Sequence, residues 1–435
     1  MEVTEEKPIT RFDYIYMFVM VIYMAQATPE TSRMVTELSG NPIPLLFPIV
    51  LTYMLCTKNP ISFRCKKLWT VLGTYSLWAM LSLLKYRIFT TAEISFHLFM
   101  MYAIIIAYIH NQVYGYRILG IYEKIIVWFC KVALFLWVLS ISIPQTSSFF
   151  RIFQEIGLGN NVLYIFTWID PERAPLAATM RNAGCSWEPG RFAIMVTLAI
   201  FCNLCQNGIK FRKNSNIWWL LTALVSTMST TGFVAALALY SLFSIKRLNL
   251  KAILIFLFVM LPIIYGIFQL DFMSGKLRNR FEKAQDVSYL KESFEWNKKT
   301  RKKGAYEGSI DRFDAIPFEW MNLKKDPILG YSRNFEHSYF RTHLTSNYQL
   351  ANGLFKIPAM YGIFLGTFFF VILFISSKRM AEDSFEKRNV GLALVLCMSA
   401  ISYQILSIPI FTTFWFYGLF AERETDIEEY IDIEA

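Results

Sequence analysis

The sequence offers little material for a disulfide framework or a metal site. Of its seven cysteines, only Cys185 falls in a segment that we expect outside the membrane, which excludes an external disulfide framework. Cys202 and Cys205 form a CxxC pair without a second pair, and the six-residue spacing of His337 and His343 fits no common ligand pattern. We therefore expect neither a metal nor any other cofactor.

Three further features are missing. Residues 1–10 carry three glutamates and one lysine and lack the basic leader of a cleaved signal peptide, so we expect the first span to stay as a signal anchor. No internal repeat is visible, which disfavours a secondary transporter. Apolar runs such as 253–269 do not alternate with polar residues, as the strands of a membrane barrel do.

Apolar residues are abundant. They make up 55% of the 435 residues, more than a soluble globular chain carries. A helix needs roughly 20 residues to cross the ~30 Å hydrocarbon layer. We predict an all-α polytopic membrane protein with about 12 transmembrane helices, near 12–28, 41–57, 68–84, 93–110, 124–143, 189–206, 216–230, 231–245, 250–270, 354–376, 389–405 and 408–421. The stretch 216–245 is open: either two short spans meet at Ser229-Thr230-Thr231-Gly232, or one long segment precedes a re-entrant piece.

The orientation follows from lysine and arginine in the short loops. One set of loops holds most of them, and the opposite set holds only Arg33, Lys85 and Arg87. Because cytoplasmic loops carry the basic excess, we expect both termini in the cytoplasm. The net charge of +10 is explained by these loops and by anionic lipid, and it does not indicate nucleic acid as a partner.

This topology divides the chain into six parts. They are five N-terminal helices (1–143), a first external loop (144–188), helices six to nine (189–270), a large and partly helical external loop (271–353), helices ten to twelve (354–421) and an acidic cytoplasmic tail (422–435). Long polar segments on one side of a membrane protein indicate that its chemistry takes place there, so we expect the active site on the external side.

The first candidate site lies where the first loop returns to the membrane. Pro189 suits the first turn of a helix, and Glu188 would then lie at the positive end of the helix dipole. Arg181 and Arg191 flank this carboxylate. One interpretation is a capped helix with interfacial arginines. The other is a site for an anionic ligand, because a guanidinium group binds phosphate through two parallel hydrogen bonds and keeps its charge.

The second candidate site lies in the large loop. Arg312 opens an amphipathic stretch that ends in a Pro-x-x-Gly turn at 327–330, and His337, Arg341 and His343 follow. Each histidine alone is more often a surface residue than a base. The basic run 298–303 is typical of a solvated stretch. Lys356, close to the outer surface, is expected to face the same external cavity as the loop arginines.

Three patterns in this order resemble the O-antigen polymerase and O-antigen ligase superfamily of bacterial envelopes. Arg181…Gly184…Glu188-Pro189 is similar to its R-x-x-G-x-x-x-E-P pattern, and Arg312 with 326–330 is similar to its arginine followed by P-x-x-G. The stretch 352–366 is similar to its H-N-x-x-L…G-I-x-G pattern. The resemblance covers residues ~100–376. Ligases begin the third pattern with a histidine regarded as catalytic, whereas this chain has Ala351, which favours a polymerase.

The resemblance implies a metal-independent glycosyltransferase of a bacterial inner membrane that joins repeat units carried on undecaprenyl pyrophosphate. It also implies that the two long external loops and the active site lie in the periplasm. A sugar hydroxyl of one unit attacks the anomeric carbon of another, and arginines stabilise the departing pyrophosphate. A chain-length regulator and a flippase are candidate partners besides the lipid bilayer. We assign catalysis to Glu188, Arg312 and His337, with Glu188 either a base or an orienter of the arginines. Substrate binding is assigned to Arg181, Arg191, Arg280, Arg341, His343 and Asn352.

Two alternatives remain open from the sequence. A ligase would transfer finished glycan to another acceptor, and cells without it would accumulate long lipid-linked polymer. A flippase or exporter of lipid-linked sugar would need a charged cavity through the helix bundle, and charged residues in the middle of the spans are few. The identity of the sugars and the linkage cannot be read from the sequence.

Overall fold

The structure is a computed structural model. It describes residues 8–24, 43–87, 89–143, 149–150, 152, 161–162, 165–169, 180–244, 309–310, 312, 315–333, 337–344, 349–350, 352–384 and 390–421. The expected span at 250–270, Arg280, the basic run 298–303, Ala351 and the acidic tail lie outside these residues.

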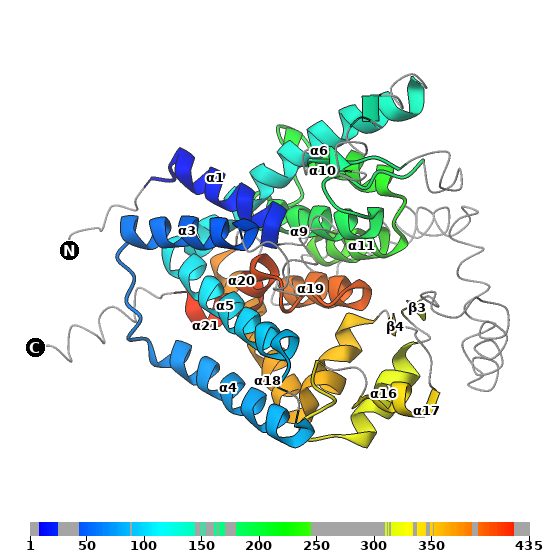
Figure 1. Cartoon of the computed structure of the whole chain (residues 1–435). Coiled ribbons are helices and arrows are strands. Elements are labelled where there is room, and N and C mark those ends of the chain that lie inside the picture. Colours follow the sequence, from blue (N-terminus) through cyan, green and yellow to red (C-terminus); the bar gives the residue numbers. More distant parts are fainter. Residues whose placement is uncertain are drawn as a thin grey trace, which may run out of the picture.

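The protein is mostly helical (Figure 1). Within the described residues, four stretches are long and apolar enough to cross a membrane: Glu93–Val113, Gly115–Ser142, Pro189–Asn207 and Gly353–Asp383. These helices indicate a membrane protein in a lipid bilayer. The helices are α1 (Arg11–Val19), a π-helical turn (Met20–Met24), α3 (Ile43–Lys58), α4 (Lys66–Tyr86), α5 (Thr91–Val113), a 3-10 turn (Gly115–Arg117), α6 (Ile118–Ser142), α9 (Pro189–Asn207), α10 (Ser215–Thr227), α11 (Thr230–Ser244), α16 (Ala315–Lys325), α17 (Tyr339–Leu344), α18 (Gly353–Asp383), α19 (Gly391–Ser402), α20 (Pro409–Trp415) and α21 (Tyr417–Phe420).

Helix α9 lies at the centre of the bundle. It packs against α6, α10, α11 and α19, and nearly all of its side chains are buried (Figure 1). Its start agrees with the prediction from the sequence: Glu188 is the N-cap residue in an extended conformation, and Pro189 is the first helical residue. The carboxylate of Glu188 therefore lies at the N-terminal end of a buried helix.

The stretch 216–245 forms two short helices and not one long segment. Helix α10 ends where Met228 adopts a left-handed conformation with φ of 48°, and α11 begins two residues later. The helices contact α9 on different sides, α10 together with α6 and α11 together with α19. The turn between them exposes backbone and hydroxyl groups that a continuous helix would have hidden.

Two short strand pairs organise the loops. Strand β1 (Asn161–Val162) pairs antiparallel with β2 (Phe166–Thr167), whose Thr167 N–H donates to the Gly184 carbonyl over 2.7 Å. Strand β3 (Ser309–Ile310) pairs parallel with β4 (Gln349–Leu350). Because the second pair ends just before Arg312 and Asn352, it brings these two residues together at the start of α18.

Helix α18 is broken at Gly362, which has φ of 77° and ψ of 170°. The turn after α16 fills the break: the Ile363 N–H donates to the Pro327 carbonyl over 2.8 Å, and the Tyr331 N–H donates to the Ala359 carbonyl over 3.1 Å. Broken helices at membrane depth are tolerated where protein satisfies the freed backbone groups. The second and third patterns of the sequence analysis therefore pack against each other.

The expected span 408–421 is helical but not continuous. The segment forms two short helices, α20 and α21, which are interrupted at Phe416. Every side chain of α20 is buried, and the Trp415 indole donates to the Phe369 carbonyl of α18 over 2.8 Å. An apolar run of 10–14 residues is more often a piece of protein core than a membrane span. The first expected span, 12–28, is also interrupted, because α1 passes into the π-helical turn after Val19.

Candidate functional site

Three arginines from separate segments gather around Glu188. Arg181 precedes α9, Arg191 lies in its first turn, and Arg312 comes from the large loop. Burial raises the pKa of the Glu188 carboxyl, and the charges of Arg191, Arg312 and Arg181 oppose this rise. All three guanidinium groups therefore lie within electrostatic reach of one carboxylate, half-buried beside the end of a helix.

Arg312 is fixed at both its backbone and its side chain. Its guanidinium Nη1 donates to the Thr231 hydroxyl of α11 over 2.8 Å. Its carbonyl accepts a 2.7 Å hydrogen bond from the side-chain amide of Asn352, which also caps α18 by accepting from the Phe355 N–H. Asn352 thus holds Arg312 in place through the backbone and does not face the site with its amide.

Arg181 is held by the turn between α10 and α11. Its Nε donates to the Thr227 carbonyl over 3.0 Å. The neighbouring Asn182 binds Ser226 twice, with its backbone N–H to the carbonyl over 2.9 Å and with its side-chain amide to the hydroxyl over 3.0 Å. Burial lowers the pKa of the Arg181 guanidinium and Glu188 opposes this, although arginine keeps its charge at neutral pH. One turn therefore anchors two arginines that are 131 positions apart in the sequence.

Tyr403 joins this group, and sequence reasoning missed it. Its ring centroid lies 4.8 Å from the guanidinium carbon of Arg191 and 5.7 Å from that of Arg312. Arg191 also lies 5.5 Å from the Trp187 ring. These are cation–π distances. Tyr403 follows α19 inside a long apolar stretch. In such a stretch the sequence alone does not indicate that a tyrosine contacts charged groups.

Gly190 leaves open the space that these residues share. A Cβ atom at this position would lie 3.0 Å from the Tyr403 hydroxyl, and 3.6 Å from both Arg312 Nη2 and Glu188 Oε1. Three polar groups from different segments therefore face one point above the first turn of α9. Two hydrogen-bond donors with a helix N-terminus suit an anionic ligand, and the carboxylate suits the proton of a hydroxyl group.

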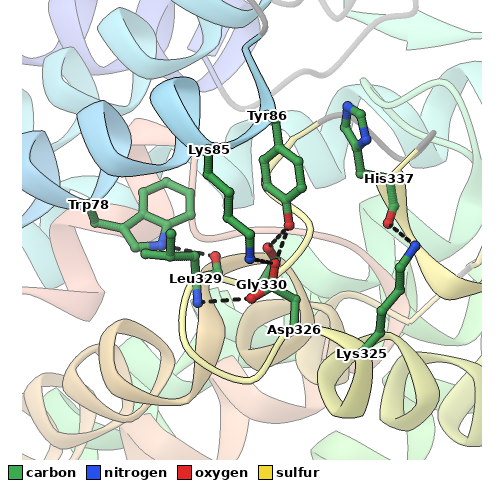
Figure 2. Close-up of polar contacts among 8 residues, drawn as sticks. All are labelled: Trp78, Lys85, Tyr86, Lys325, Asp326, Leu329, Gly330 and His337. Carbon is green, nitrogen blue, oxygen red and sulfur yellow. Dashed lines mark hydrogen bonds and ion pairs between the residues drawn. The ribbon is translucent and has the colours of Figure 1, made fainter.

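The structure does not place the other predicted site residues in this group. His337 stacks on Tyr86 at 4.5 Å, and its carbonyl accepts from Lys325 over 2.9 Å (Figure 2). Arg341 is half-buried in α17, where its N–H donates to the Ser338 hydroxyl over 3.0 Å. His343 belongs to the same helix, but its side chain lies outside the described residues, as does all of Arg280.

Figure 2 shows how the large loop is attached to α4. The Asp326 carboxylate contacts both Lys85 and Tyr86, and the Tyr86 hydroxyl also donates to the Gly330 carbonyl over 2.6 Å. The Trp78 indole donates to the Leu329 carbonyl over 3.1 Å. These contacts hold the turn 326–331 between α4 and the break in α18.

A second charged group, also missed by sequence reasoning, lies between α16 and α18. Glu319 is only 1% exposed, and its Oε2 accepts from the Asn322 amide over 2.9 Å. Burial raises the pKa of the Glu319 carboxyl to about 7, opposed by Lys356 and Asn322. Lys356 therefore faces Glu319. Among the described residues, no three His, Cys, Asp or Glu side chains gather as ligands for a metal ion.

The gathering of Arg181, Arg191 and Arg312 around Glu188, with Tyr403 against two of them, is the most concentrated polar arrangement that these candidates form. No family model and no curated protein matches the chain.

Proposed function

We propose that the chain is a polysaccharide polymerase of the O-antigen type, a multi-pass glycosyltransferase of a bacterial inner membrane. It would join lipid-linked repeat units at the periplasmic face, with about twelve spans, both termini in the cytoplasm and the two long loops outside. The observation that carries this proposal is the convergence of three arginines on one carboxylate at the N-terminal end of α9.

The charge of this site matches the proposed leaving group. Three guanidinium groups and one carboxylate sum to +2, and a pyrophosphate esterified on both sides carries −2. Arginine suits this ligand because its planar fork binds phosphate oxygens in pairs. Half-burial strengthens the attraction, since charges interact more strongly where water is partly excluded.

The transfer follows from these groups. An acceptor hydroxyl attacks the anomeric carbon, its proton passes to a base, and the bond between that carbon and the pyrophosphate oxygen breaks. The bonding electrons leave with the pyrophosphate, whose growing charge is stabilised by Arg181, Arg191 and Arg312. Glu188, enclosed by these arginines, orients them and offers a carboxylate for the proton.

A reconstitution experiment tests the proposal. The purified protein is incubated in liposomes with lipid-linked repeat units from the cells that produce it, and the products are separated by length. We expect a ladder of lengths for the unaltered protein, no ladder for Arg312→Ala and an unchanged ladder for Arg212→Ala, an exposed arginine outside the site. Transport without covalent change would indicate a flippase, and transfer of finished glycan to another acceptor would indicate a ligase. Either result would overturn the proposal.

A further inference from the structure

We propose that Tyr403 is a ligand-binding residue whose hydroxyl donates a hydrogen bond to a phosphate oxygen held by Arg191 and Arg312. This inference rests on the proposed function, which it extends by adding a neutral donor to the three arginines. The ligand class is a pyrophosphate, either free or at the head of a lipid.

The ring of Tyr403 is set between two of the binding groups. The guanidinium carbons of Arg191 and Arg312 lie 4.8 and 5.7 Å from its centroid. A ring at these distances attracts both cations and limits the orientations that their flexible side chains adopt. The ring thereby keeps the positively charged side chains of Arg191 and Arg312 in place before any anion binds.

The hydroxyl lacks a partner. Within the part of the chain that the structure describes, the buried Tyr403 oxygen makes no hydrogen bond. Leaving a buried hydroxyl unpaired is unfavourable, and such a group in a native protein usually binds a ligand or an ordered water. The oxygen lies 3.0 Å from the Cβ position of Gly190, beside Arg312 Nη2 and Glu188 Oε1. It therefore points into the space where the other polar groups of the site meet.

The backbone of Tyr403 is held in position. Its carbonyl packs so tightly against Gly353 that a Cβ atom there would lie 2.3 Å from the oxygen. Its N–H donates to the Ser399 carbonyl at the end of α19 over 3.2 Å. Gly353 is the first residue of α18 and follows Asn352, whose side chain binds the Arg312 carbonyl. Tyr403 therefore packs against the same end of α18 that holds Arg312. The ring and its hydroxyl are thus preorganised for a ligand.

The test uses two substitutions that separate ring from hydroxyl. Tyr403→Phe keeps the ring and removes only the oxygen, whereas Tyr403→Leu removes both. Tyr361→Phe is the matched control, because Tyr361 is fully buried and packs against Trp78. Each purified variant is titrated in nanodiscs with a polyprenyl pyrophosphate, with inorganic pyrophosphate and with the phosphate-free polyprenol. Both binding and the thermal unfolding midpoint are measured.

We expect Tyr403→Phe to bind the pyrophosphate probes about tenfold more weakly, which is the usual effect of one hydrogen bond to a charged group. Tyr403→Leu should bind more weakly still, and Tyr361→Phe should bind like the unaltered protein. Without ligand, Tyr403→Phe should unfold at the same temperature or higher, since it removes an unpaired group. A merely structural tyrosine would give the opposite pattern, with a lower midpoint and unchanged affinity.

The outcomes separate the two proposals. If the unaltered protein binds pyrophosphate and Tyr403→Phe binds it equally well, the role of Tyr403 is wrong and the proposed function stands. If the unaltered protein binds none of the pyrophosphate probes, both are wrong. Equal binding of polyprenol and polyprenyl pyrophosphate would show that the lipid chain alone is recognised, which also contradicts the role of Tyr403.

Discussion

Gly362 packs directly against the carbonyl of Ile328, so that a Cβ atom on Gly362 would lie 1.9 Å from the Ile328 oxygen. The contact joins the break in α18 to the turn that follows α16. A similar contact exists at Gly330, whose Cβ position is 2.4 Å from the Met360 oxygen, with φ of 68°. The two segments interlock through backbone alone, which only glycine permits at these points.

We predict that Gly362→Ala separates the large loop from α18. The backbone conformation at Gly362 is confined to glycine and costs any other residue on the order of 1–3 kcal/mol, and the collision with Ile328 adds to this. The thermal unfolding midpoint should fall by several degrees, and synthesis of polymer should stop. The measurement is thermal unfolding of the purified variant in detergent.

Gly73→Ala is the control for this substitution. Gly73 lies within α4, and apart from its chain neighbours and the backbone of its own helix no atom lies within 4 Å of its Cβ position. Alanine in a helix interior is more favourable than glycine by roughly 0.5–1 kcal/mol, so this variant should be equally or more stable. A Gly362→Ala protein as stable as the Gly73→Ala protein would contradict the interlocking of the two segments.

The local parts of the fold were predictable from the sequence. The expected span 189–206 agrees with α9 (Pro189–Asn207), because its apolar composition, Pro189 and Glu188 are all local signals. The helices near 68–84 and 354–376 were also expected, although α4 and α18 are longer. The interruption of 408–421 at Phe416 gave no signal in the sequence, because the run is apolar on both sides of that residue.

The arrangement of the site was only partly predictable. Arg181, Arg191 and Arg312 were selected as phosphate ligands from residue type and motif, but their distance from one another depends on the turn between α10 and α11. Nothing in the sequence indicated that Tyr403 and Glu319 have polar neighbours, because these neighbours come from segments distant in the sequence. His337 was selected by residue type alone, and its described contacts are with Tyr86 and Lys325.

We predict that the Thr231 hydroxyl positions Arg312 for catalysis. Thr231→Val keeps the shape of the side chain and removes the acceptor of the 2.8 Å hydrogen bond. The guanidinium would then lose its orientation, and kcat should fall about tenfold, the usual cost of a lost hydrogen bond to a charged group. Thr231→Ser retains the hydroxyl and should restore the rate. Equal rates for the valine and serine variants would exclude this role.

We predict that Glu188→Gln separates binding from turnover. The substitution removes the negative charge of Glu188 beside three arginines, so a pyrophosphate probe should bind more tightly, about tenfold at low salt. Polymer synthesis should nevertheless fall, because a neutral amide neither accepts the proton of the hydroxyl nor orients the guanidinium groups. Binding and synthesis are measured on the same preparation at two salt concentrations. Weaker binding by the glutamine variant would contradict the proposed charge balance.

We predict that stability decreases with pH through the ionisation of Glu319. The pKa of this carboxyl is about 7 in the folded protein and 4.5 for an ordinary glutamate, so the folded state holds the proton more tightly. The stabilisation is complete below about pH 4.5, declines as pH rises and is lost above about pH 7, a difference of ~3 kcal/mol. The glutamine of Glu319→Gln stays neutral and still accepts a hydrogen bond from Asn322. The unfolding midpoint of this variant should therefore vary less between pH 5 and 8. At pH 8 it should exceed the midpoint of the unaltered protein. Glu382→Gln, at an exposed carboxylate, should leave the pH dependence unchanged. If Glu319→Gln shows the same pH dependence as the unaltered protein, the proton resides elsewhere.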